Sequence, residues 1–203
     1  MSPVIALLLP KSKGKPEVST WFRLQAPDND SNMCGSTDRL FDGLNGLAVC
    51  AKCGYKTDPF YINPAFRVKR RVYDVSYTYD GYQIVSRKFK EACLRAKLTG
   101  VGFQELPADS EFFHLKPTAV VSFDGERSHT SFLRRCPACS HFRDIVGLNP
   151  ACLKSAPTTD LSRTDLLFGS GNEMHPLIIL SETAKDVIQR ERLIGIRFDS
   201  VRV

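Results

Sequence analysis

Two cysteine pairs constrain this chain more than any other feature of its sequence. The segments Cys50-Ala51-Lys52-Cys53-Gly54 and Cys136-Pro137-Ala138-Cys139-Ser140 each place two residues between two thiols. This spacing lets both sulfurs of a pair face one point, so each pair can supply two of the four tetrahedral ligands of a zinc ion. The two pairs together predict one zinc site, with the ligands Cys50, Cys53, Cys136 and Cys139.

We expect this zinc to be structural, because four protein ligands leave no open position for a substrate or a water molecule. The sequence also lacks a GxSxG elbow, a phosphate-binding glycine loop, an HExxH pair and a dinucleotide-binding fingerprint. The only histidine close to a pair is His141, which we expect to be exposed on a loop. The sequence therefore nominates no catalytic residue and predicts a protein that is not an enzyme.

Two alternatives remain open for the cysteine pairs. They can form reversible disulfides, or they can be free thiols without a metal. A redox CxxC normally begins a helix, whose dipole lowers the thiol pKa, and Pro59 disfavours a helix after the first pair. Four thiolates around a dication also leave excess negative charge, and several basic residues close in sequence can offset it: Lys52, Lys56, Arg134, Arg135 and Arg143.

The other three cysteines carry no predicted role as ligands. Cys93 falls on the apolar stripe of a predicted helix and is expected in the core, whereas Cys34 and Cys152 lie in polar segments and are left unassigned. An odd total of seven cysteines favours reduced thiols over a disulfide framework. The apolar run Val4–Leu9 is too short to span a bilayer and follows no basic leader, so we expect a buried strand, no membrane association and a cytoplasmic location.

An internal repeat is the second informative feature. The segment Ile84–Phe103 aligns without a gap to Ile179–Phe198, which follows it by 95 residues. The identical pairs include Ser86 and Ser181, Lys90 and Lys185, Arg95 and Arg190, Leu98 and Leu193, Gly100 and Gly195, and Phe103 and Phe198. The repeat predicts an internal duplication with halves near 1–107 and 108–203, packed as one zinc-stapled domain.

Each copy of the repeat predicts a strand, a helix and a second strand. Ser86 and Ser181 are suited to cap the helices 87–97 and 182–192, because a serine hydroxyl accepts from free amides of the first turn. A glycine then allows the left-handed conformation that ends many helices.

The remaining sequence is rich in β signals. Alternation over Arg67–Tyr79 predicts a long strand, and Asp80-Gly81 predicts a tight turn into the next strand. Val120–Phe123 followed by Asp124-Gly125 predicts a second hairpin. The stretches 26–39 and 151–163 are predicted loops. The expected fold class is α+β, with two related strand-helix-strand halves joined by the four-cysteine site.

The net charge of +6 comes from 28 basic and 22 acidic residues, spread along the chain. The densest basic run is Lys69-Arg70-Arg71, and together with Tyr73, Tyr77 and Tyr79 on one strand it can offer charge and stacking to nucleic acid. A solvated strand face explains the same pattern, and we expect no nucleic-acid partner.

The order of these motifs resembles the double-CXXCG motif proteins. Besides the cysteine pairs, the similar segments are Asp80–Ser86, Leu98–Phe103, Phe112–Pro117 and Leu180–Phe198. One departure is Ser140, which stands where the family name implies glycine. Members of this family are bacterial immunity proteins encoded beside polymorphic toxins.

The resemblance implies a cytoplasmic, non-enzymatic protein that binds and neutralises a cognate toxin. It names no residues of the toxin-binding surface. Two other functions follow from the residues themselves: a zinc-ribbon protein that binds nucleic acid or regulates, and a redox sensor that uses the CxxC pairs.

Overall fold

The computed structural model describes residues 21–36, 39–40 and 47–203. The predicted strand Val4–Leu9 lies outside these ranges. The described chain is mixed, with many strands and two α-helices, so the expected α+β composition is confirmed.

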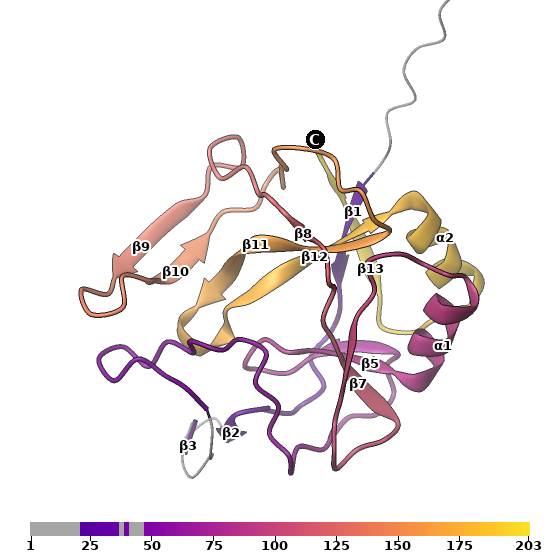
Figure 1. Cartoon of the computed structure of the whole chain (residues 1–203), viewed down its shortest axis with the longest axis horizontal. Coiled ribbons are helices and arrows are strands. Elements are labelled where there is room, and N and C mark those ends of the chain that lie inside the picture. Colours follow the sequence, from indigo (N-terminus) through magenta and orange to yellow (C-terminus); the bar gives the residue numbers. More distant parts are fainter. Residues whose placement is uncertain (1–20, 37–38, 41–46) are drawn as a thin grey trace, which may run out of the picture.

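Seven strands form the larger sheet, which crosses the molecule in Figure 1. Its order is β13-β1-β12-β11-β10-β9, and β8 pairs in parallel with β11 while the other pairs are antiparallel. The strands are β1 (Trp21–Gln25), β8 (Val120–Val121), β9 (Ser131–Arg135), β10 (Phe142–Val146), β11 (Leu161–Ser170), β12 (His175–Ser181) and β13 (Arg197–Val201).

A four-stranded sheet of order β4-β5-β7-β6 lies beside the larger one. Its strands are β4 (Val75–Tyr77), β5 (Gln83–Ser86), β6 (Phe103–Glu105) and β7 (Phe112–Leu115). A separate two-stranded ladder joins β2 (Gly35–Ser36) and β3 (Arg39–Leu40), and a short 3-10 helix, η1 (Gly171–Glu173), connects β11 to β12.

The two helices, α1 (Arg87–Arg95) and α2 (Glu182–Arg190), lie side by side (Figure 1). Both begin as the sequence predicts. The Ser86 hydroxyl accepts from the amide of Phe89 at 3.2 Å, and the Ser181 hydroxyl accepts from the amide of Ala184 at 3.1 Å. The matching capping bonds show that the two serines act in the same way, each satisfying an amide of the first turn.

Two strands pair with elements far away in the sequence. β1 lies between β12 and β13, with Phe22 opposite Leu180. β7 lies between β5 and β6 in the smaller sheet, with Phe113 opposite Val85. An early strand is thus paired with the C-terminal elements, while a strand beyond residue 107 completes the sheet of the preceding segment.

Two aspartates connect the helix starts with distant loops. Asp74 accepts from the Ser86 hydroxyl at 2.6 Å and from the amide of Ile194 at 2.8 Å. Asp160 accepts from the Ser181 hydroxyl at 2.8 Å and from the amide of Thr99 at 2.9 Å. Each carboxylate therefore fixes the start of one helix and the loop that follows the other helix.

A glycine in each of these loops allows the close approach. A Cβ atom on Gly100 would lie 2.1 Å from the carbonyl oxygen of Leu161, and a Cβ atom on Gly195 would lie 2.6 Å from that of Val75. Both glycines also have positive φ, +75° and +87° respectively. Close packing and backbone conformation thus both require glycine here.

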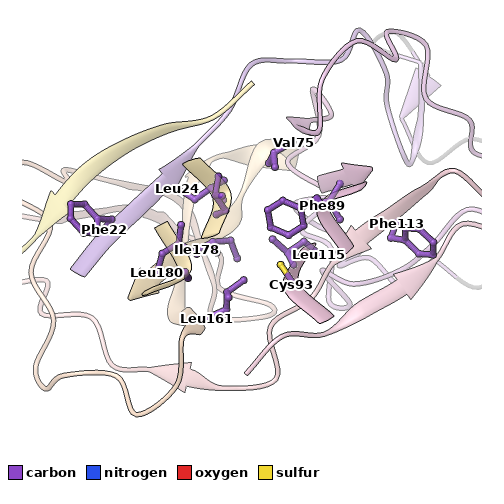
Figure 2. Close-up of a cluster of buried hydrophobic side chains, with 13 residues drawn as sticks. Phe22, Leu24, Val75, Phe89, Cys93, Phe113, Leu115, Leu161, Ile178 and Leu180 are labelled. Carbon is purple, nitrogen blue, oxygen red and sulfur yellow. The ribbon is translucent and has the colours of Figure 1, made fainter. Parts of the chain in front are cut away.

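One hydrophobic cluster joins the two helices to both sheets, as Figure 2 shows. Phe89 and Cys93 of α1 face side chains of the larger sheet, among them Leu24 and Ile178. Cys93 is 1% exposed, which confirms its expected place in the core. Since this cluster draws on residues from Phe22 to Ile188, it forms only when distant segments have come together.

The predicted hairpin at Asp80-Gly81 is confirmed, because β4 and β5 are antiparallel neighbours. The long strand predicted over Arg67–Tyr79 is wrong, and only Val75–Tyr77 forms a strand. The preceding residues bond elsewhere: the amide of Val68 donates to Asp109, and the amide of Lys69 donates to the Ser31 hydroxyl. Side chains satisfy these amides, so no ladder is required.

The second predicted hairpin is also wrong. Val120 and Val121 pair in parallel with β11, and Phe123 makes an isolated bridge to Leu153. The hairpin in this region is instead β9–β10, whose connection carries the second cysteine pair. The apolar run identified a strand correctly, but its partner was decided by long-range packing.

The two unassigned cysteines are both buried. Cys34 is 0% exposed, with its Sγ atom 3.3 Å from the Tyr82 hydroxyl, and Cys152 is 2% exposed. Their polar sequence surroundings gave no sign of this burial.

A buried histidine predicts an acid-sensitive fold. Burial, together with the positive charges of Lys116 and Lys56, lowers the pKa of His114 to about 3. The unfolded chain therefore takes up a proton near pH 6.5, which the folded chain does not take up until near pH 3. We expect the free energy of unfolding to fall as the pH is lowered through this window. His114→Gln should reduce the slope of this free energy against pH by at most about 1.4 kcal/mol per pH unit.

Urea unfolding at several pH values between 7.5 and 5, followed by circular dichroism, measures these slopes. Identical slopes in the wild type and the His114→Gln variant would contradict the prediction.

Candidate metal centre

The four predicted ligands come together in the structure. Their Sγ atoms all lie within 4.8 Å of one another. The Sγ atoms of Cys50 and Cys136 are 4.0 Å apart, and those of Cys53 and Cys139 are 3.6 Å apart. Both of these contacts join one pair to the other, although the two pairs lie 86 residues apart in sequence.

These separations suit a tetrahedral metal. With metal–sulfur bonds of about 2.3 Å, the sulfurs of a tetrahedral site lie about 3.8 Å apart. Separations of 3.6 and 4.0 Å lie on either side of that value. The cluster is thus compatible with a four-thiolate metal site.

The two cysteine turns have the same backbone design. The amide of Gly54 donates to the carbonyl of Cys50 at 2.8 Å, and the amide of Ser140 donates to that of Cys136 at 2.9 Å. A second bond closes each turn: the amide of Cys50 donates to the carbonyl of Tyr55 at 2.9 Å, and that of Cys136 donates to the carbonyl of His141 at 2.8 Å. Each pair is therefore held in shape by its own backbone.

Ser140 takes a left-handed conformation, which glycine adopts more readily than serine. Its φ is +61°, close to the +71° of Gly54 at the matching position. A left-handed backbone costs serine more than glycine, because the serine Cβ approaches the following carbonyl. The departure at this position leaves the geometry of the turn intact.

An aromatic pair lies beside the cluster. The rings of Tyr55 and His141 stack with centroids 4.2 Å apart and an angle of 16° between their planes. These residues follow the two cysteine turns at equivalent positions. His141 is exposed, as predicted, and it is not among the clustered ligands. The stack adds a contact between the two turns that does not depend on a metal.

The backbone prepares the first cysteine of each pair for ionisation. Backbone amides of Cys53 and Lys52 lower the pKa of the Cys50 thiol. Amides of Cys139 and Ala138 lower that of Cys136 to about 6. Since a metal binds the thiolate and not the thiol, this environment prepares Cys50 and Cys136 as ligands. The pKa values of Cys53 and Cys139 are raised instead, by burial and by contacts with the other cysteines.

The basic residues near the cluster have more varied roles than the sequence indicated. Lys56 is buried and donates to the carbonyl of Asp80 at 2.7 Å, so it anchors the first turn to the core. Arg134 forms an ion pair with Asp144. Arg135 remains next to the second turn, where its Nε donates to the carbonyl of Ser140 at 3.2 Å.

No histidine or carboxylate joins the four sulfurs within the described part of the chain. Four sulfurs already complete a tetrahedral shell, so a metal held here has no free position for a substrate. Sulfur-only tetrahedral ligation suits Zn²⁺, and iron is the other common occupant of such sites.

No protein-family model matches this chain, and no curated protein matches it. Within the described residues, neither helix is long and apolar enough to cross a membrane.

Removing one cysteine from either pair should release the metal. We expect one bound metal ion per chain in protein purified without added metal, and none in the Cys50→Ser and Cys136→Ser variants. Structural zinc sites contribute about 10–16 kcal/mol of apparent binding energy, and each lost kcal/mol lowers the Tm of a chain of this size by about 2–4 °C. Both variants should therefore melt more than roughly 10 °C lower.

Elemental analysis identifies and counts the metal, and calorimetry gives the Tm. Cys152→Ser is the matched control, because it removes a thiol outside the cluster and should keep the metal. A wild-type protein free of metal, with thiols that oxidise reversibly in pairs, would favour the redox alternative.

The left-handed Ser140 predicts a stabilising substitution. Ser140→Gly relieves the backbone strain but adds conformational freedom to the unfolded chain. We expect the free energy of unfolding to rise by a net amount of about 0.5–1 kcal/mol. Ser170→Gly is the control, since Ser170 has a φ of −128° and should lose stability on the same change. Chemical denaturation with metal present compares the stability of the two variants. A loss of stability in Ser140→Gly would contradict the prediction that the backbone of Ser140 is strained.

Proposed function

We propose that this chain is a non-enzymatic immunity protein that binds and neutralises a cognate toxin in the bacterial cytoplasm, with a zinc ion holding its fold. The observation that carries the proposal is the closed cluster of four cysteine sulfurs, which ties two distant segments together and leaves no position for catalysis. The order of the sequence motifs is similar to that of the double-CXXCG proteins, and this resemblance is the reason for proposing a toxin as the partner.

Several features support zinc in a structural role. The sulfur separations suit Zn–S bonds, both cysteine turns are formed by backbone bonds, and amides lower the pKa of Cys50 and Cys136. The cluster lies between a turn near the start of the described chain and the β9–β10 hairpin. A metal here would stabilise the fold by linking segments that lie far apart in the sequence.

We further propose that the chain is an internal duplication with halves near 1–107 and 108–203, which exchange their first strands. Matching positions support this: the two cysteine turns, the serine caps and the two bridging aspartates recur in the same order. β1 completes the sheet of β12 and β13, while β7 completes that of β5 and β6. Such an exchange explains why one hydrophobic core serves both halves.

A rigid body suits an inhibitor. A protein that is already ordered loses little conformational entropy on binding, and a standard interface of about 1,200–2,000 Å² with a few buried anchors gives tight complexes. The shared core and the linked helix starts favour such a body. A closed metal site fits the same role, because the metal then stabilises the surface and takes no part in chemistry.

The nucleic-acid alternative gains less support. Arg71 pairs with the buried Asp109, and the guanidinium of Arg70 lies 5.1 Å from the ring centroid of Tyr73. Tyr77 is on β4, but Tyr73 and Tyr79 lie outside that strand, so the three tyrosines do not share one strand face. The charge and stacking surface expected from the sequence is therefore not assembled.

Coexpression with a toxin tests the proposed function. The probe is the toxic C-terminal domain encoded by the gene adjacent to that of this chain. We expect wild-type protein to restore growth, and Cys50→Ser to lose protection because its fold is weakened. Asp186→Asn, which changes an exposed residue of α2, is the control and should protect fully.

Purified components give the second readout. The chain and the toxin domain should form a stable complex in size-exclusion chromatography, and the toxin's activity should fall to background at equimolar ratio. A toxin that stays active with excess chain would contradict the proposal. Binding of the chain to nucleic acid, with affinity that falls steeply as salt rises, would replace it with the alternative.

A further inference from the structure

A cavity of about 420 Å³ opens at the junction of the two sheets, away from the cysteine cluster. Three segments form its walls: β1, the turn between β4 and β5, and the β11–β12 hairpin. Its volume falls within the range of about 300–1,000 Å³ that is typical of small-ligand sites.

Aromatic rings line much of this cavity. Tyr77 and Tyr79 belong to one wall, and Phe168 and His175 to the opposite one. The rings of Tyr77 and His175 are 4.9 Å apart between centroids. Aromatic faces carry negative partial charge and attract cations, and Tyr79 is 44% exposed, so its ring is open to a ligand.

Acidic side chains lie at the mouth. Asp28 and Glu173 line the cavity, both are exposed, and neither forms an ion pair with another described residue. A third carboxylate, Asp30, is not a lining residue, but it accepts from the hydroxyl of the lining residue Tyr79 at 3.0 Å. This hydrogen bond, with the charges of Asp30 and Asp28, raises the pKa of Tyr79. A negative mouth in a chain of net charge +6 marks a local departure from the rest of the molecule.

The cationic groups of the cavity do not cancel this charge. Arg23 pairs with Asp199, which offsets part of its charge. The Nδ1 atom of His175 lies 2.8 Å from the carbonyl oxygen of Glu173, which can only accept. Nδ1 therefore carries the proton, and Nε2 of the neutral ring is left as an acceptor. Burial lowers the pKa of His175, with added repulsion from Lys56 and Arg23, which favours the neutral ring.

The wall that carries His175 and Glu173 belongs to the β11–β12 hairpin, which is longer than the β4–β5 hairpin that resembles it. β11 and β12 contain ten and seven residues, whereas the corresponding β4 and β5 contain three and four. The turn at Gly81 packs against this longer hairpin: a Cβ atom there would lie 2.5 Å from the carbonyl oxygen of Glu173. The cavity thus depends on an extension that the shorter hairpin lacks.

From these observations we propose that the cavity between β1, the β4–β5 turn and the β11–β12 hairpin binds a guanidinium or alkylammonium group. The cation would lie among the rings of Tyr77, Tyr79 and Phe168, with Asp28 and Glu173 supplying the opposite charge and His175 Nε2 an acceptor. This site requires neither the metal nor the toxin proposed above, so its failure would leave both untouched.

Titration with N-acetyl-arginine amide tests the site. We expect it to shift amide NMR signals of the cavity, among them those of Gly81 and Gly169, and N-acetyl-citrulline amide to bind at least about fivefold more weakly because it lacks the charge. The Asp28→Asn/Glu173→Gln double variant should weaken arginine binding by about fivefold or more. Asp186→Asn, which changes an exposed acid on α2, should bind like the wild type.

Two further probes distinguish the sources of the cation. Tighter binding of agmatine than of an arginine-containing peptide indicates a small diffusible amine, and the reverse order indicates a side chain of a protein partner. Both results support a cation site. Equal binding of the arginine and citrulline amides, the absence of binding, or shifts confined to residues outside the cavity would overturn it.

Discussion

Strand pairing between distant segments is the constraint on which the rest of the structure depends. β1 reaches across to complete the ladder of β12 and β13, and β7 completes that of β5 and β6. Neither group of strands is complete without a strand from elsewhere in the chain. The helices then pack over a core that belongs to both sheets (Figure 2), so the parts of the molecule are expected to fold together.

The cysteine cluster adds a link of a different kind. Its two turns lie outside the hydrophobic cluster that joins the helices to the sheets, and Tyr55 and Phe142 beside them pack against a second cluster. Sulfur ligands can hold such segments because each metal–thiolate bond is strong and directional, whereas surface packing is not. Lys56 extends this link inward through the carbonyl of Asp80, which connects the first turn to the buried region around Tyr82.

The cysteine cluster and the cavity differ in the chemistry that they can support. A metal held by the four sulfurs would have no open position, whereas the cavity is open and is lined by the exposed Asp28 and Glu173. An inhibitor needs both a stable body and a distinctive surface, since specificity comes from local charge and shape and not from net charge. The longer β11–β12 hairpin provides that local difference within otherwise similar surroundings.

The sequence by itself determined the features that depend on short-range geometry. The CxxC spacing predicted which sulfurs cluster, and the serines and helical periodicity predicted where α1 and α2 begin. Tertiary structure decided what depends on distant partners: the short extent of β4, the parallel pairing of β8, the burial of Cys34 and the assembly of the cavity. The reason is physical, because helix caps and cysteine turns form bonds within a few residues, whereas strands and cavities require surfaces that only the folded chain brings together.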